Sequence, residues 1–103
     1  MEADTNSAVT LPLVDSHAHL DDSQFDSDRN EVLERARTAG VGAILAIGCN
    51  IHALDAPAAI AASHDWIYCA AGVHPHEAKL ATQQHYDTLN RLAAHPKFLA
   101  WGE

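Results

Sequence analysis

The chain has few cysteines, few basic residues and no long hydrophobic runs, and each shortage excludes a class of protein. Its 103 residues include only two cysteines, too few for a small domain held together by disulfides. Fourteen acidic residues outnumber six basic ones, giving a formal net charge of −8, so the chain has no basic patch that could bind nucleic acid through surface charge. No apolar run approaches the roughly 18 residues that a membrane span needs. If the protein handles phosphates, metal ions or residues outside this chain must balance their charge.

The rest of the composition is that of an ordinary globular domain. Apolar residues make up 48% and charged residues 19%, which excludes wholesale disorder. The polar residues 1–10 predict a disordered N-terminal tail, and residues 11–103 predict a single domain without an internal boundary. The tail lacks the basic and apolar segments of a signal peptide. We therefore expect a cytoplasmic protein with reduced thiols and no membrane association.

Apolar and helical segments alternate along the chain in the order β-α-β-α-β-α-β. Apolar runs suited to buried strands lie at 11–14, 41–47 and 66–71, and a fourth strand is expected from residue 98. Helices are expected at 28–39, 56–64 and 82–95, with caps at Asp28, Asp55 and Thr82. The strands start roughly 25–30 residues apart, which is the spacing of βα units joined by right-handed crossovers. The pattern predicts an α/β fold with parallel strands.

Residues that can bind a metal ion follow the first predicted strand. His17 and His19 are two residues apart, and side chains at this spacing on an extended strand point to the same face. Two imidazoles on one face at the carboxyl end of a strand can reach one metal ion. The alternative is a pair of structural histidines, one of them hydrogen-bonded to a backbone carbonyl. The longer pattern Asp15-Ser16-His17-Ala18-His19-Leu20-Asp21 favours the metal.

Two further strands end in residues of the same kind. His74-Pro75-His76 follows the third strand, and the proline can fix the bend that aims His74 into the same cleft. Glu103 comes at the end of the fourth strand. The alternatives are a rigid loop with solvated histidines and a solvated terminal carboxylate. Potential metal or phosphate ligands at the ends of three out of four strands favour a shared site, because sites of α/β proteins gather at that edge of the sheet.

Other polar residues have simpler interpretations. Cys49 and Cys69 lack metal-binding spacing and are expected on buried strands, so we expect small core residues. The carboxylates between Asp21 and Asp28 predict a solvated acidic loop that ends in a helix cap. The sequence contains no nucleophilic-serine, phosphate-loop or dinucleotide-binding motif.

The sequence resembles the N-terminal part of TatD-type metal-dependent deoxyribonucleases. Four segments carry the resemblance: Asp15 to Asp21, Phe25 with Asp28-Arg29, Ala71 to His76, and Gly102-Glu103. The resemblance implies a TIM-type (β/α)8 barrel of which this chain holds the first four β/α units, a truncated half-barrel with parallel strands. It therefore predicts that the chain is a fragment.

The resemblance also implies roles for individual residues. His17 and His19 would bind one divalent metal ion, and Glu103 would bridge it to a second ion at the catalytic centre. His74 would contact the substrate phosphate. The cofactors would be two divalent ions, Mg²⁺, Mn²⁺ or Zn²⁺, and the substrate would be DNA or another phosphodiester. The family's remaining ligands, two histidines and an aspartate from later strands, have no counterpart here, so the fragment alone is expected to be inactive.

Two other functions remain open at this point. Another hydrolase barrel with a His-x-His pair, such as an amidohydrolase or a phosphoesterase, would share His17 and His19, although the Gly-Val-His-Pro-His motif ending at His76 argues against it. A non-catalytic half-barrel that acts as an interaction module would show no metal binding that depends on His17. Four strands of a closed barrel would expose two sheet edges and an apolar interior face, so we also expect the truncated chain to self-associate or aggregate.

Overall fold

The structure is a computed structural model and describes residues 12–102. The predicted tail 1–10, Leu11 and Glu103 lie outside the described residues. In chain order the elements are β1 (Leu13–Ala18), the 3₁₀ helix η1 (Ser23–Phe25), α2 (Arg29–Thr38), β2 (Val41–Gly48), α3 (Ala56–Ala62), β3 (Ile67–Ala71), the 3₁₀ helix η2 (Pro75–Leu80), α4 (Gln83–Leu92) and β4 (Phe98–Trp101). The predicted alternation of strands and helices is confirmed. No helix among the described residues is both long enough and apolar enough to cross a membrane.

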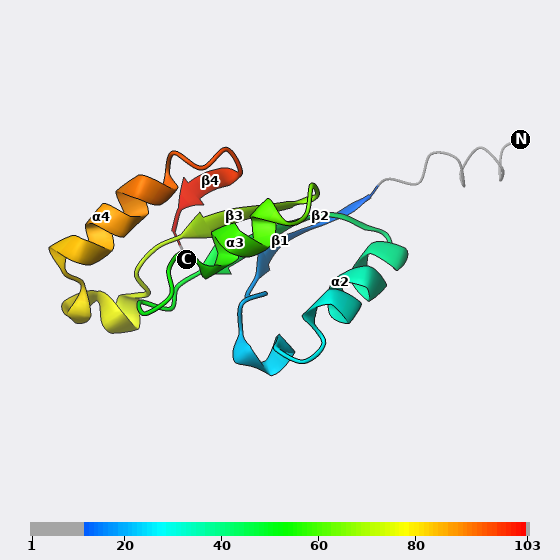
Figure 1. Cartoon of the computed structure of the whole chain (residues 1–103), viewed down its shortest axis with the longest axis horizontal. Coiled ribbons are helices and arrows are strands. Elements are labelled where there is room, and N and C mark those ends of the chain that lie inside the picture. The colour runs from blue at the N-terminus through cyan, green and yellow to red at the C-terminus, as the bar shows by residue number, and fades with distance from the viewer. Residues whose placement is uncertain (1–11, 103) are drawn as a thin grey trace, which may run out of the picture.

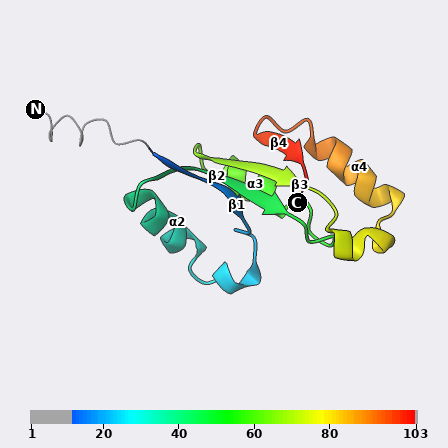
Figure 2. The same ribbon diagram turned by 180° about the vertical axis from the view of Figure 1, so that it is seen from behind.

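The four strands form one parallel sheet in the order β1-β2-β3-β4 (Figure 1). Each crossover leads to the next strand in the same direction. Because such crossovers are right-handed, steps in one direction place the helices on one face of the sheet. Figure 2 shows the same arrangement from behind, with α3 against β2 and β3. This is the wall of a (β/α)8 barrel and not a doubly wound sheet, in which the strand order reverses.

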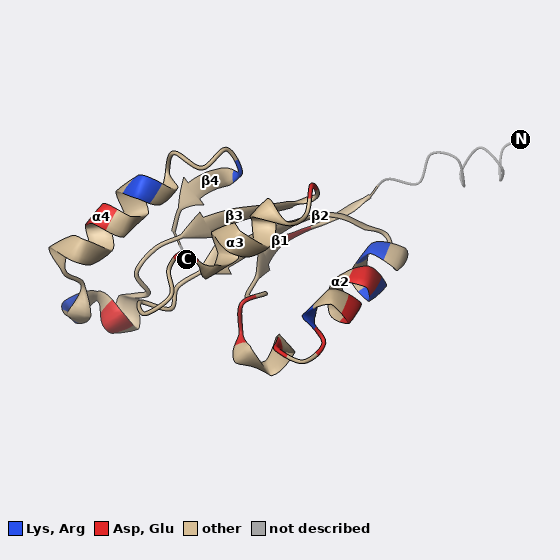
Figure 3. Cartoon of the chain, in the orientation of Figure 1, with Lys and Arg blue, Asp and Glu red and all other residues tan. Residues whose placement is uncertain are grey.

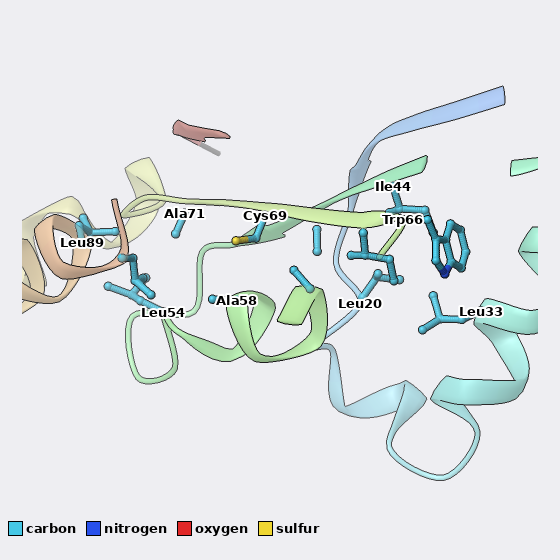
Figure 4. Packing of buried hydrophobic residues seen from close by; sticks show 13 residues of the cluster. Leu20, Leu33, Ile44, Leu54, Ala58, Trp66, Cys69, Ala71 and Leu89 are labelled. Atoms are coloured by element: carbon cyan, nitrogen blue, oxygen red, sulfur yellow. The ribbon is translucent and has the colours of Figure 1, made fainter. Parts of the chain in front are cut away.

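The core lies between the sheet and the helices that cover this face. Ala46 of β2 and Cys69 of β3 are 0% and 1% exposed, and they belong to the same cluster as Ala58 of α3. Figure 4 shows Leu33 of α2 and Trp66 close together at the end of this cluster that lies opposite Leu89. Small residues on α3 and on the strands let the helix pack closely against the sheet, and this packing fixes the positions of the strand ends.

The edge strands are more exposed than predicted. The first strand runs from Leu13 to Ala18 and is not buried, because the side chains of Leu13 and Val14 are 63% and 68% exposed. At the other edge, Leu99 and Trp101 are 60% and 62% exposed. The prediction of a buried first strand is wrong for this chain, because within the described residues β1 has a neighbour on one side only.

The predicted cap residues precede their helices, but they do not all act as predicted. Asp28 precedes α2 and Asp55 precedes α3, and neither side chain accepts a capping hydrogen bond from the described backbone. Thr82 precedes α4, and its backbone N–H donates to Nδ1 of His85 at 2.9 Å, so an imidazole acts where a glutamate usually closes the capping box. Gly40 follows α2 with φ +107°, a conformation that glycine adopts without strain.

Lys97 joins the end of α3 to the start of β4. Its ammonium group donates hydrogen bonds to the carbonyl oxygens of Ala61, at 3.1 Å, and His64. The same group lies 5.0 Å from the centre of the Tyr68 ring on β3. One half-buried cation therefore satisfies carbonyl groups at the C-terminal end of a helix, where positive charge is favourable.

Candidate functional site

A bulge in β1 delivers the predicted histidine pair to the carboxyl edge of the sheet. Asp15 pairs with Ile44 and Ala18 pairs with Ala46, so three steps along β1 match two steps along β2. His17 lies within this bulge, and its backbone N–H donates to the Asp15 carboxylate at 3.1 Å. The structure brings His17 and the following histidine of the pair together, since their ring centres are 5.0 Å apart and the rings are nearly perpendicular.

The ring of His19 is held in one tautomer by a backbone carbonyl. Its Nδ1 lies 3.2 Å from the carbonyl oxygen of Ile47, at the end of β2. A carbonyl oxygen can only accept, so Nδ1 must carry the hydrogen, and the lone pair of the neutral ring is on Nε2. Metal-binding histidines usually have this arrangement, with the second ring nitrogen bonded to a carbonyl or a carboxylate. The donor chemistry of His19 therefore fits a divalent metal ion.

A pocket of about 420 Å³ lies beside this imidazole. Its lining residues come from the segments that follow β1 and β2: His19, Asp21, Asp22, Ser23, Cys49 and Asn50. Asp22 and Asp26 are exposed, as expected for a solvated acidic loop, whereas Asp21 and Asp28 are half-buried. Figure 3 shows further acidic positions along the segment between β1 and α2. The concentration of carboxylates next to His19 favours cations over anions.

The two cysteines differ in their surroundings. Cys69 is buried on β3, as predicted. Burial raises the pKa of the Cys69 thiol, and the positive charge of Lys97 opposes this shift. Cys49 was expected on a strand as well, but β2 ends at Gly48, and Cys49 is a half-buried residue of the following segment.

Arg29, the first residue of α2, fixes the segment that follows His19. Its Nε donates to the carbonyl oxygen of Leu20 at 2.6 Å. Its Nη2 donates to the carbonyl oxygen of Asp22 at 3.1 Å and to the carboxylate of Asp26 at 3.0 Å. Sequence reasoning assigned Arg29 no role beyond its place in the resemblance. A positive charge in the first turn of a helix, where the dipole disfavours it, was the signal that could have found it.

His74 stands directly after β3 and has the opposite tautomer from His19. The backbone N–H of His76 donates to His74 Nδ1 at 3.0 Å, so this nitrogen must carry the lone pair. The hydrogen of the neutral ring is then on Nε2. Pro75, the proline expected to fix the bend after β3, is the first residue of the 3₁₀ helix η2. His74 is therefore prepared to donate a hydrogen bond through Nε2, which suits an anionic oxygen better than a metal ion.

The segments that leave β2, β3 and β4 begin side by side. The Gly72 N–H donates to the carbonyl oxygen of Gly48 at 3.0 Å, and the Gly102 N–H donates to that of Ala71 at 2.9 Å. A Cβ atom on Gly72 would lie 3.2 Å from backbone atoms of Gly102, so only glycine permits this close approach without displacement. Glu103, the predicted bridging ligand, is outside the described residues. Within residues 12–102, no group of three or more His, Cys, Asp or Glu side chains comes together as a metal site.

Comparison with known proteins identifies relatives over most of the chain. The family model described as "TatD related DNase" matches residues 14–103. The Bacillus subtilis protein named "Uncharacterized metal-dependent hydrolase YabD" is 36% identical over 91 residues. The protein from Erwinia tasmaniensis named "3'-5' ssDNA/RNA exonuclease TatD" is 38% identical over 92 residues. Each alignment covers 88% of this chain and 36% of the relative.

A solved structure agrees with these relatives. The crystal structure of YjjV, a TatD homologue from Escherichia coli K12, matches with a TM-score of 0.78 and 28% sequence identity. The match covers 88% of this chain and 36% of that one. This chain therefore spans about a third of the length of the proteins it matches.

Proposed function

The chain belongs to the TatD-related DNase family, and on that premise we propose that it supplies part of the active site of a metal-dependent nuclease that hydrolyses phosphodiester bonds in DNA. The observation that carries the proposal is the pair of opposite tautomers at the carboxyl edge of the sheet. His19 has its lone pair on Nε2, whereas His74 has its hydrogen on Nε2. One ring is prepared for a cation and the other for an anionic oxygen.

In this proposal His17 and His19 would hold a divalent metal ion, and the Glu103 carboxylate would help to hold this ion and a second one. The ions would be Mg²⁺, Mn²⁺ or Zn²⁺. When bound, such ions stabilise negative charge on the attacking and leaving oxygens of a phosphodiester and activate water. The Ile47 carbonyl keeps the His19 ring in the binding tautomer, which lowers the cost of ordering the site. The negative net charge of the chain agrees with this proposal, because metal ions and not lysine side chains would neutralise the charge of the phosphate.

His74 positions the substrate. Its Nε2–H donates to a non-bridging phosphate oxygen, while the bond from the His76 N–H to Nδ1 keeps the ring from turning over. A relative named as an exonuclease of single-stranded DNA and RNA supports a nucleic acid as the substrate. We propose DNA or another phosphodiester for this protein. A cytoplasmic location stays a prediction.

Self-association through the sheet edges is a further proposal. The exposed apolar side chains of β1 and β4 lie on strands whose outer backbone groups have no strand beside them within residues 12–102. An open edge of this kind pairs readily with another strand. We propose that the 103-residue chain associates with further copies of itself at these edges.

Metal titration of the 103-residue chain tests the metal site. We expect isothermal titration with Mn²⁺ or Zn²⁺ to show binding that His19→Ala weakens at least 10-fold, because an oriented imidazole ligand is lost. His17→Ala should have a similar effect. His52→Ala, in an exposed loop after β2, is the matched control and should leave the affinity unchanged. Equal affinity of wild type and both variants would support the non-catalytic module and overturn the proposal.

The role of His74 needs a protein extended to the length of its relatives. The assay is cleavage of single-stranded DNA, with phosphomonoesters and cyclic amides as substrates of the competing hydrolase classes. We expect His74→Ala to raise KM for DNA, whereas His74→Gln should retain part of the binding, because the glutamine amide can place a donor near the position of Nε2. Preference for cyclic amides over DNA would reject the nuclease proposal.

A further inference from the structure

We propose that Arg29 is a positioning residue for His19. It holds the turn that follows His19, and through this turn it sets the place of the imidazole that the proposed function assigns to a metal ion. The inference therefore rests on the proposed function. Arg29 itself binds neither the metal ion nor the phosphate in that function.

One guanidinium group binds two backbone carbonyls of a short turn, and the second of them, that of Asp22, also accepts the Phe25 N–H at 3.0 Å. The Asp22 N–H donates to the carbonyl oxygen of His19 at 3.1 Å, which closes the turn over residues 19–22. Arg29 Nε binds the Leu20 carbonyl at 2.6 Å, and Nη2 binds the Asp22 carbonyl at 3.1 Å. Two donors in one rigid plane fix the orientation of the turn as well as its distance from α2.

The helix itself does not explain an arginine at this position. Arg29 is the first residue of α2, where the helix dipole disfavours positive charge. Its ion pair with Asp26 is a surface pair, since the Asp26 side chain is 70% exposed, and such pairs contribute little. The Arg29 side chain is only 25% exposed. The carbonyls of the turn are thus the contacts that account for the placement of the guanidinium.

Both ends of this connection are anchored in the core. Leu33 fixes α2 with a side chain that is 2% exposed, and Leu20 fixes the turn with one that is 6% exposed. Arg29 joins the two. His19 is then held from two sides, by its ring bond to the Ile47 carbonyl and by the turn that begins at its own carbonyl. Without Arg29 the turn would keep its own backbone bond to the His19 carbonyl but would lose its link to α2.

The test compares Arg29→Met and Arg29→Lys with two controls in the 103-residue chain. Methionine keeps much of the stem but removes all donors, and lysine keeps the charge but cannot bind two carbonyls in one plane. Arg35→Met, at an exposed position of the same helix, is the matched control. Asp26→Asn removes the ion pair and leaves the carbonyl bonds.

Two readouts separate positioning from general stability. The first is the tautomer of His19 in metal-free protein, from long-range ¹H–¹⁵N NMR of the imidazole. The second is the affinity for Mn²⁺ or Zn²⁺. We expect wild type and both controls to keep hydrogen on Nδ1 of His19. Both Arg29 variants should populate the other tautomer and bind the metal at least 10-fold more weakly.

Different outcomes would reject the role of Arg29 and the metal site of the proposed function. An unchanged His19 tautomer and metal affinity in Arg29→Met would overturn the inference. Full rescue by Arg29→Lys would also overturn it, because charge and not the planar fork would then suffice. Loss of the folded NMR spectrum in both variants would reassign Arg29 to general stability and reject the positioning role. If wild type binds no metal, the proposed function fails, while the tautomer still decides whether Arg29 orients His19.

Discussion

Replacing Lys97 by methionine removes a cation from the end of α3 and keeps most of the length of the side chain. In the folded chain the ammonium group donates to the carbonyl oxygens of Ala61 and His64 and lies over the Tyr68 ring. Methionine cannot donate a hydrogen bond, so both carbonyls lose this partner in the variant. The side chain is half-buried, and water replaces the ammonium group only in part.

The expected loss of stability follows from these contacts. A hydrogen bond that involves a charged group contributes about 1.5–3 kcal/mol, and a contact between a cation and an aromatic ring adds about 0.5–1 kcal/mol. Water at the two carbonyls and the burial of the methionine side chain offset part of the sum. We expect the free energy of unfolding to fall by roughly 2–3 kcal/mol. For a domain of this size the melting temperature would fall by about 8–24 °C.

Urea unfolding followed by circular dichroism measures this loss, at protein concentrations low enough to prevent association. Lys79→Met, at an exposed position in η2, is the control and should lie within about 0.5 kcal/mol of wild type. The slope of the unfolding free energy with urea should be the same for all three proteins. A value for Lys97→Met as close to wild type as the control would show that the end of α3 does not depend on this cation, and the reasoning would be refuted.

Three further changes test other parts of the structure. Gly72→Ala places a Cβ atom 3.2 Å from the Gly102 backbone, so we expect urea unfolding to show a loss of roughly 1–3 kcal/mol; wild-type stability would contradict the close approach of these strand ends. Because burial raises the pKa of the Cys69 thiol, iodoacetamide at pH 8 should label Cys69 more slowly than Cys49, as measured by mass spectrometry of peptides. The same shift means that Cys69 favours folding less as the pH rises above the ordinary thiol pKa of about 8.5, and faster labelling of Cys69 would contradict its burial. Trp101→Lys puts a charge on the exposed edge strand β4, so sedimentation velocity should show weaker self-association, and unchanged association would exclude this edge as the contact.

The sequence predicted the order of elements because apolar runs and helix caps are local signals. The run at 41–47 became β2 with an extension of one residue, and the helix expected at 82–95 ends at Leu92. The exposure of Leu13 and Val14 was not predictable in the same way. Apolar side chains are more stable when they are buried from water, but the sequence of one strand does not show which part of the protein buries them.

The candidate site was predicted in part, and the missing part depends on backbone atoms. The spacing of His17 and His19 identified the pair. The carbonyl that sets the His19 tautomer belongs to Ile47, which is distant in the sequence and has no donor or acceptor side chain that could draw attention to it. The bonds of Arg29 likewise end mainly on backbone carbonyls, which every residue type provides. Contacts of this kind become visible only when the chain is folded.

The bulge in β1 makes the position of His17 depend on the number of residues in this strand as well as on their side chains. From Leu13 to Val14, β1 advances one residue while β2 advances two, and the bulge between Asp15 and Ala18 restores the offset between the two strands. Deleting Ser16 would remove the additional residue, so Asp15 could stay opposite Ile44 and Ala18 opposite Ala46 with even pairing between them. His19 would then keep its place beside the Ile47 carbonyl, whereas His17 would directly follow Asp15 and lose its bond to that carboxylate. A missing codon at this point should therefore displace one histidine of the pair and leave the other in place, which an exchange of the residue it encodes would not do.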